Sequence, residues 1–342
     1  MRKGDCKMNE KLTIAVPTYN RATELKSLLQ EILQQLAEVA PGFAAVRVSD
    51  NASTDSTREA VAGLSEDFLR RGSRLDYVRN DENVGFSRNV DRAVKGASGE
   101  WVVIMGDDDS FEEGTLSYLE RVFGEHPELD ALLLGNRRYD ADLSTALEPL
   151  REDSSSLELF VDGSDYIRKF HAFPPALVSG YYIRRTSWIA SRAEEFDYSI
   201  SIHMLTLTRM MADRATVAVS NRSSVKYRAD QKNSTWPGDS LYPFRFWLDA
   251  LLASKMLRKE CARDVFGILN KVAYRVLAYY VIRQKVLQHK FDRRQFENFY
   301  LRAKSGVNRY SLIILIMRFV PNWLAKLSFK GLVEKTEHYT VD

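Results

Sequence analysis

The first 110 residues alternate between short apolar runs and longer stretches in which apolar side chains recur every three or four positions. The short runs predict buried strands at residues 12–16, 46–49, 75–79 and 101–105. The spacing between them predicts helices at residues 23–36, from 53 or 55 to about 69, and 86–95. Strands and helices that alternate in this way indicate βαβ units, and so an α/β fold with a mostly parallel central sheet flanked by helices.

The pattern is less regular after residue 130. Short apolar runs predict further strands at residues 131–135, 178–183, 216–219 and 224–227, with a helix at 202–211 and a polar loop at 141–157. After residue 236 the chain has few Gly or Pro breaks, which predicts helices to about residue 330. We therefore expect three regions, namely an N-terminal tail (1–10), an α/β domain (11–236) and a helical C-terminal region (237–342).

Charge separates the C-terminal region from the rest. Residues 251–342 contain 18 Lys and Arg against 7 Asp and Glu, whereas the whole chain has a net charge of +3. This basic excess predicts either an anionic partner or a set of solvated helix faces. The apolar stretch at residues 310–327 carries interspersed Arg and Lys, so it predicts either a peripheral membrane contact or packing on the body or in a homo-oligomer.

The cysteines and the terminal sequence bear on the compartment. Cys6 and Cys261 form neither a metal-ligand spacing nor a disulfide framework, which favours a reducing compartment. The first residues lack a signal-peptide pattern, and we find no run of about 18 apolar residues that would span a membrane. We therefore expect a cytoplasmic protein, with the inner face of the plasma membrane as the alternative location. We expect no nucleic-acid partner.

Polar residues follow three of the predicted strands, at residues 17–21, 50–55 and 107–109. Ligands bind at the carboxyl ends of the strands in parallel sheets, so these loops predict the site. The last loop is a run of three aspartates, whose mutual repulsion a divalent cation would relieve. Oxygen ligands favour Mg²⁺ or Mn²⁺ over zinc. The alternative is a solvated acidic loop before a helix.

Residues 12–136 resemble the nucleotide-binding half of family 2 glycosyltransferases, which have the GT-A fold. Five segments in the family's order carry the resemblance, namely VPTYNR (16–21), VSDNASTDST (48–57), NVGFSRN (83–89), ASGEW (97–101) and IMGDDD (104–109). The last segment and the later VSGYY (178–182) also resemble the abequosyltransferase-like branch of bacterial surface-polysaccharide transferases. The resemblance implies a nucleotide-sugar-binding half at residues 11–136 and an acceptor-binding half at 137–236.

The resemblance also implies roles for the loop residues. Contacts to the nucleotide, its phosphates or the donor sugar fall to Pro17, Thr18, Tyr19, Asn20, Arg21, Asp50, Asn51, Arg88, Asp107 and Asp108. Asp109 is the first choice as ligand of Mn²⁺ or Mg²⁺, with Asp107 beside it. The donor is expected to be a UDP-sugar, with dTDP or CDP as alternatives, and the acceptor a glycan or a lipid-linked oligosaccharide.

The catalytic base is the point at which the chain departs from the family. Many members carry Glu-Asp before a helix that contains an arginine, and counting back from Arg209 puts His203 in the place of that aspartate. Histidine titrates near neutrality and can accept the proton of an acceptor hydroxyl. A single histidine on a helix is also a common structural residue, and Asp197 is the rival base.

These features predict a metal-dependent, non-processive transferase, inverting if the base is as described, that adds one sugar during bacterial O-antigen, capsule or other surface-polysaccharide synthesis. Two alternatives stay open. A sugar nucleotidyltransferase would share the βαβ units but would require a Gly-rich loop after the first strand, where this chain has PTYN at residues 17–20. A nucleotide-sugar-binding protein with little or no catalytic activity would need no base.

Overall fold

The computed structural model describes residues 10–149, 156–170, 174–175 and 177–228. The chain divides into two compact units, one made of Met1–Tyr166 with Pro174–Lys232 and the other of Ile167–Phe173 with Asn233–Asp342. The first unit is the one considered below. The helices expected after residue 236, and with them the apolar stretch at 310–327, lie outside the described residues. Within the described part of the chain, no helix is both long enough and apolar enough to cross a bilayer.

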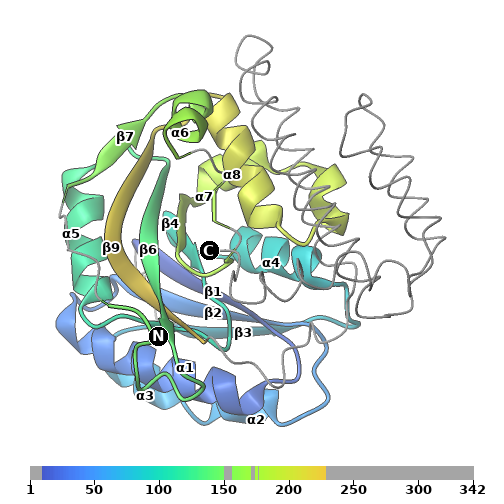
Figure 1. Ribbon diagram of the computed structural model, residues 1–342. Coiled ribbons are helices and arrows are strands. Elements are labelled where there is room, and N and C mark those ends of the chain that lie inside the picture. The colour runs from blue at the N-terminus through green and yellow to red at the C-terminus, as the bar shows by residue number, and fades with distance from the viewer. Residues whose placement is uncertain (1–9, 150–155, 171–173, 176, 229–342) are drawn as a thin grey trace, which may run out of the picture. The chain divides into compact units, whose positions relative to one another are not determined.

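A curved sheet forms the centre of the first unit (Figure 1). In chain order its strands are β1 (Leu12–Thr18), β2 (Ala44–Asp50), β3 (Leu75–Arg79), β4 (Trp101–Ile104), β5 (Ser110–Phe111), β6 (Ala131–Tyr139), β7 (Glu158–Phe160), β8 (Tyr181–Arg184) and β9 (Val217–Arg228). Their order across the sheet is β3-β2-β1-β4-β8-β6-β9-β5, and β7 pairs with β9.

The direction of the strands changes in the middle of this sheet. Strands β1 to β4 pair in parallel, as the alternation of strands and helices predicts. Strand β8 runs antiparallel to both β4 and β6, whereas β6 and β9 are parallel and β5 and β7 pair antiparallel with β9. The mostly parallel arrangement therefore belongs to the first half, and the whole sheet is mixed because the regular strand–helix alternation stops there.

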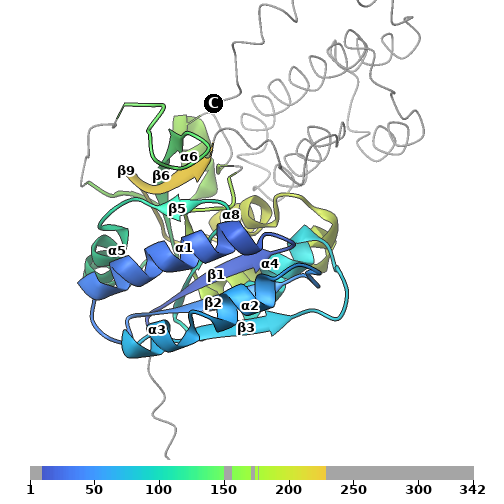
Figure 2. The same cartoon turned by 90° about the horizontal axis from the view of Figure 1, so that it is seen from below.

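Helices cover both faces of the parallel half. The helical segments are α1 (Ala22–Gln35), η1 (Leu36–Glu38), α2 (Thr57–Ala62), α3 (Ser65–Arg70), α4 (Phe86–Lys95), α5 (Thr115–Glu125), α6 (Gly163–Phe170), α7 (Arg185–Ser191), η2 (Glu194–Tyr198) and α8 (Ile202–Ala212). Figures 1 and 2 show α1, α2 and α3 on one face of β1–β3 and α4, α7 and α8 on the other. The single helix expected up to residue 69 is two short helices, which separate at Gly63 and Leu64.

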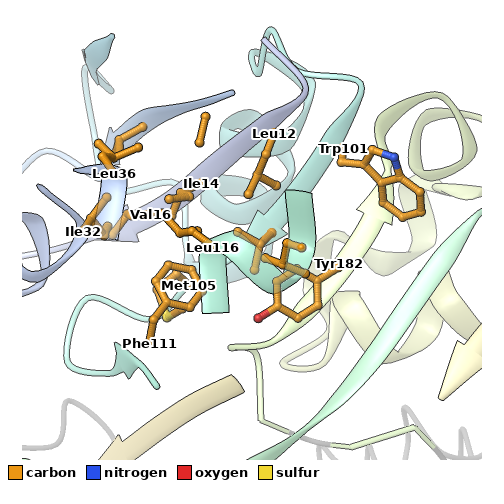
Figure 3. Close-up of a cluster of buried hydrophobic side chains, with 14 of the residues drawn as sticks. Leu12, Ile14, Val16, Ile32, Leu36, Trp101, Met105, Phe111, Leu116 and Tyr182 are labelled. Atoms are coloured by element: carbon orange, nitrogen blue, oxygen red, sulfur yellow. The ribbon is translucent and has the colours of Figure 1, made fainter. Parts of the chain in front are cut away.

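The core forms where β1 and β4 meet the helices. All seven residues of β1 are buried. Figure 3 shows Ile14 and Val16 of this strand beside Ile32 and Leu36 from the helical layer. Each of these side chains is at most 5% exposed, so the layer resists any change in side-chain volume. The polar loops at the ends of β1 and β4 are therefore mounted on a rigid support.

Strand β9 replaces two strands predicted at residues 216–219 and 224–227. It is continuous, but its register with β6 shifts on either side of Gly135. A Cβ at Gly135 would lie 2.9 Å from the backbone oxygen of Asn221. The irregular part of β9 thus fills the space that a side chain at position 135 would need. Residues 220–223 in this part are polar, and for that reason the sequence pattern divided β9 into two strands.

Candidate functional site

The site lies at the carboxyl ends of three neighbouring strands, β2, β1 and β4. The end of β1 pairs with the end of β2, because Thr18 is in register with Asp50, and the backbone N–H of Asn51 donates to the Thr18 carbonyl at 2.9 Å. Asp107 follows β4 and accepts a hydrogen bond from the Thr18 hydroxyl at 2.7 Å. The structure therefore brings together the three polar loops that the sequence analysis selected.

The first two aspartates of the triplet, Asp107 and Asp108, both contact the side chain of Arg21. Arg21 forms an ion pair with Asp108, and its Nη1 lies 3.3 Å from Oδ1 of Asp107. Burial, followed by the charge of Asp108, raises the pKa of Asp107 to about 7, although Arg21 and Thr18 act in the opposite direction. Asp107 and Asp108 thus place two carboxylates around one nitrogen of Arg21.

Asp109 points toward a different neighbour. The Ser179 hydroxyl donates to its carboxylate, and the same hydroxyl accepts the backbone N–H of Gly106 at 2.9 Å. Burial, followed by the charge of Asp108, raises the pKa of Asp109 to about 7, against the hydrogen bonds from Ser179 and the backbone of Arg228. Ser179 directly precedes β8, so a residue distant in sequence contacts the triplet loop, residues 107–109.

The surroundings of Gly106 show how the loop fits a divalent ion. A Cβ at this glycine would stand 3.1 Å from Asp108 Oδ1, from Asp109 Oδ2 and from the Ser179 hydroxyl. Two carboxylate oxygens and a hydroxyl therefore border one small space. Within the described residues, no three or more His, Cys, Asp or Glu side chains gather closely enough to hold a metal. Mg²⁺ usually takes one or two carboxylates and completes its shell with water and phosphate, so this donor set fits it.

The loops after β1 and β2 are tied to each other. Asn20 has a left-handed backbone (φ +54°), its N–H donates to the Ser53 hydroxyl at 2.8 Å, and its side-chain oxygen accepts the N–H of Thr54 at 2.7 Å. Asp55 accepts the N–H of Ala22 at 3.0 Å, at the start of α1. Although its partial burial would raise the pKa of Asp55, hydrogen bonds from Thr57 and Ala22 lower it. Asp55 therefore connects the loop after β2 to the start of α1, while the residue that precedes α2 is Ser56.

The carboxylate of Asp50 is 1% exposed and is oriented by two neighbours. It accepts the backbone N–H of Ser53 at 2.9 Å and the hydroxyl of Tyr77 at 2.6 Å. Arg79 Nε lies 3.7 Å from the same oxygen as Tyr77. Burial, together with the hydrogen bond to Asp50, raises the pKa of Tyr77 well above its usual range. Tyr77 and Arg79 were not among the predicted site residues, although they stand at alternate positions of a strand next to β2, which places them on the same face of the sheet.

Four asparagines form a network beneath the loops. Asn51 donates to Asn83 at 2.8 Å, and its oxygen accepts from Asn80 at 3.1 Å and from the N–H of Val84 at 2.9 Å. Asn80 also donates to Asn89 of α4 at 2.9 Å. Asn51, which was expected to contact the donor, is 4% exposed. Its side chain instead forms hydrogen bonds that hold the loop leading into α4. Buried amides that bond one another in this way specify the local conformation.

The predicted donor residues differ in accessibility. Pro17 is buried as part of β1, whereas Tyr19 is 37% exposed at the tip of the loop. Arg88, at the first turn of α4, forms an ion pair with Asp197 of η2, with Nε and Oδ2 3.2 Å apart. Asp197 also forms an ion pair with Arg192. One of the expected donor contacts and one of the expected bases therefore contact each other.

His203 lies on the first turn of α8 and is 1% exposed. Its ring packs edge-on against Tyr181, with the two centroids 4.8 Å apart.

Arg228, which could have reached phosphate, donates from Nε to the Asp108 carbonyl at 3.1 Å and also donates to the Ala141 carbonyl. The structure thus places the Arg228 side chain against the backbone of the triplet loop.

Comparison with known proteins matches residues 13–165 to the model of glycosyl transferase family 2. Abequosyltransferase RfbV of Salmonella typhimurium is 28% identical over 196 residues, which cover 55% of this chain and 56% of that protein. A Campylobacter jejuni GalNAc(5)-diNAcBac-PP-undecaprenol beta-1,3-glucosyltransferase is 25% identical over 335 residues, 93% of this chain and 96% of that one.

Two solved structures are similar over nearly the whole chain. Staphylococcus aureus TarS 1–349 superposes with a TM-score of 0.60 at 17% identity, over 96% of this chain and 91% of that one. The mannosyltransferase PcManGT of Pyrobaculum calidifontis, solved with GDP-Man and Mn²⁺, gives 0.56 at 14% identity, over 98% and 88%. These likenesses concern the fold, and they confirm the predicted GT-A architecture.

Proposed function

Because residues 13–165 match the model of glycosyl transferase family 2, we propose that the chain transfers a single sugar from a nucleotide donor to a glycan during bacterial surface-polysaccharide synthesis. The observation that carries the proposal is the triplet loop. Asp108 Oδ1 and Asp109 Oδ2 border one space beside Gly106, at the sheet edge where Thr18 and Asp50 end their strands. A site at this edge suits a nucleoside diphosphate and a divalent ion.

Each loop has a part in donor binding. Tyr19 is the exposed aromatic that stacks on the base, and Asp50, oriented by Tyr77 and Ser53, accepts a hydrogen bond from the base. Asp109 is the principal metal ligand, with Asp108 rather than Asp107 as the second. Arg21 and Thr18 contact one oxygen each of Asp107, whereas Oδ1 of Asp108 lies on the side of Gly106, next to Oδ2 of Asp109. Mn²⁺ or Mg²⁺ held by Asp109 and Asp108 would supply positive charge for the diphosphate that leaves. UDP is the favoured nucleotide.

The proton of the acceptor goes to Asp197. The acceptor oxygen forms a bond to the anomeric carbon, the bond from that carbon to the donor phosphate breaks, and the acceptor hydroxyl proton passes to the carboxylate. The side chain of Asp197 is 22% exposed, whereas His203 is 1% exposed, so Asp197 is the better placed of the two to meet a hydroxyl. Displacement in one step by a base of this kind inverts the anomeric configuration.

The acceptor is a glycan on a lipid carrier. The Campylobacter relative is named for a PP-undecaprenol substrate and aligns with 93% of this chain, which supports a lipid pyrophosphate here. The basic excess of residues 251–342 suits the anionic headgroups and pyrophosphate at the inner face of the plasma membrane. Membrane association through this region, rather than a homo-oligomer contact, is part of the proposal.

Nucleoside diphosphate release tests the proposal. The full-length protein is incubated with a panel of UDP-, dTDP- and CDP-sugars, with Mn²⁺ and with Mn²⁺ plus chelator. We expect Mn²⁺-dependent release from at least one donor, and its loss in Asp109→Asn. Asp76→Asn is the matched control, because this carboxylate is ion-paired with Arg47 on the neighbouring strand, outside the triplet loop. Absence of metal-dependent release from every donor would overturn the assignment.

A further inference from the structure

The triplet loop contains a positive charge that belongs to the chain itself. Arg21 contacts Asp108 and Asp107 through one nitrogen, and all three side chains are at most 15% exposed. Guanidinium groups stay charged at every pH at which proteins fold. Screening by water is weak at such low exposure, so the charge of Arg21 acts strongly on any ion that approaches the loop.

The backbone holds Arg21 in this place. The residue connects β1 to α1, and its carbonyl accepts the N–H of Leu25 at 3.0 Å in the first turn of that helix. The N–H of the next residue, Ala22, is bound by Asp55. Both ends of this short connection are therefore fixed, and the arginine side chain reaches the aspartates from an anchored position.

Arg21 also divides the triplet into two parts. It faces Oδ1 of Asp107 and Oδ2 of Asp108, while Oδ1 of Asp108 and Oδ2 of Asp109 border the space beside Gly106. Asp108 thus stands between the arginine on one side and the proposed metal position on the other. A divalent ion and Arg21 are consequently neighbours that repel each other while they share one carboxylate.

We propose that Arg21 is a positioning residue that weakens metal binding by the free protein and strengthens the binding of the anionic donor. The proposal rests on the proposed function, because it concerns the same loop. With its positive charge in place, the carboxylates hold the metal tightly only when the diphosphate adds its own negative charge. Metal and donor therefore bind cooperatively, as linkage between two sites requires.

Replacing Arg21 with Gln separates the two effects. Even in a water-like dielectric, repulsion between a unit charge and a divalent ion about 5 Å apart corresponds to roughly a tenfold change in an equilibrium constant. Mn²⁺ should therefore bind Arg21→Gln about tenfold more tightly than wild type, measured by electron paramagnetic resonance of free Mn²⁺ without nucleotide. UDP without metal should bind about tenfold more weakly, measured by calorimetry. Damage to the fold would weaken both affinities.

Two further variants serve as controls. Arg47→Gln removes an arginine from another partly buried ion pair, with Asp76, and should change neither affinity. Arg21→Lys keeps the charge and should also stay within about twofold for Mn²⁺. It carries the test if the Gln variant does not fold, since a large change in Mn²⁺ affinity with the charge retained would overturn the proposal.

Unchanged or weaker Mn²⁺ binding in folded Arg21→Gln would refute the role of Arg21. This outcome is distinct from failure of the proposed function. In that case the wild-type protein would show neither Mn²⁺ binding nor metal-dependent donor cleavage. If wild type binds no Mn²⁺, the proposal for Arg21 is supported when Arg21→Gln gains a Mn²⁺ site that Asp109→Asn removes, and is overturned when it gains none.

Discussion

Arg88 Nε and Asp197 Oδ2 lie 3.2 Å apart, although 109 positions separate the two residues in the sequence. The first residue belongs to α4 and the second to η2. Arg192 forms an ion pair with the same carboxylate and also approaches Asp91 of α4, with 3.3 Å between its Nε and the aspartate oxygen. The proposed base is thus held against α4 by charged contacts.

Replacement of Asp197 with Asn should lower kcat by about 10²-fold or more, because the amide accepts no proton, while the dissociation constant for UDP stays within a few-fold of wild type. Steady-state transfer and calorimetry measure the two quantities. In comparison, His203→Ala should mainly lower the melting temperature, since it leaves a hole against Tyr181. A folded His203→Ala protein that binds UDP but has lost transfer, beside an active Asp197→Asn, would reverse the assignment.

Removal of the Tyr77 hydroxyl should weaken nucleotide binding without changing the fold. In Tyr77→Phe the ring stays, but Asp50 loses its 2.6 Å hydrogen bond and can turn away from the base. A net hydrogen bond to a charged group contributes about 1.5–3 kcal/mol, so we expect the UDP affinity to fall roughly 10- to 150-fold if Asp50 contacts the base. Calorimetry with UDP measures it. Tyr139→Phe, which removes a tyrosine hydroxyl bonded to Glu112, is the matched control and should leave UDP binding unchanged.

The part of the stability that comes from Asp107 should fall, without metal, as the pH rises from about 4 to 7. Burial, followed by the charge of Asp108, raises the pKa of Asp107 to about 7, so between pH 4 and 7 the folded chain binds more protons than the unfolded chain. The stabilisation by the protonated carboxyl is complete below the unfolded pKa and is lost as pH rises through the folded value. Thermal unfolding with chelator, at pH 5 and pH 8, should show a smaller decrease in Asp107→Asn than in wild type. An equal decrease in both would contradict this account.

Alanine at Gly135 should destabilise the sheet. Its Cβ would lie 2.9 Å from the Asn221 carbonyl oxygen, a backbone atom that moves only with the turn of β9. Overpacking of this kind costs about 1–3 kcal/mol. Gly124→Ala provides the control, because a Cβ there meets nothing within 4 Å and alanine favours the helix α5. Urea denaturation should rank Gly124→Ala at or above wild type and Gly135→Ala below it.

Local sequence patterns were sufficient for the elements that the chain builds from neighbouring residues. The helix at residues 86–95 has the bounds expected from its apolar spacing and the glycines that flank it. The helix expected to run to residue 69 is instead two helices, α2 and α3, each of which buries only one or two side chains. The apolar spacing of the whole stretch does not reveal this division. Strand β9 was split in the prediction, because the register shift opposite Gly135 depends on a strand some eighty residues away.

The candidate site shows the same limit. The three polar loops were found from their places after buried strands, and Thr18 and Asp107 do meet there. The residues that orient the site were missed, among them Tyr77 and Ser179, because each acts on a side chain from a distant part of the sequence. Asn51 was expected at the donor because of the family resemblance of its loop. Its buried amide is explained by its partners Asn80 and Asn83, which lie some thirty residues further along the chain.

The antiparallel course of β8 has a consequence for how such enzymes diversify. Since Ile104 of β4 pairs with Tyr181 at the beginning of β8, the chain reaches the edge of the sheet that carries residues 107–109 before it enters the sheet, and the Ser179 hydroxyl contacts Gly106 and Asp109 there. Between β6 and this serine the described chain forms β7, which pairs with β9, and the helix α6, with loops between them. Insertions there could reshape acceptor choice while the sheet, and the chemistry it supports, is inherited intact.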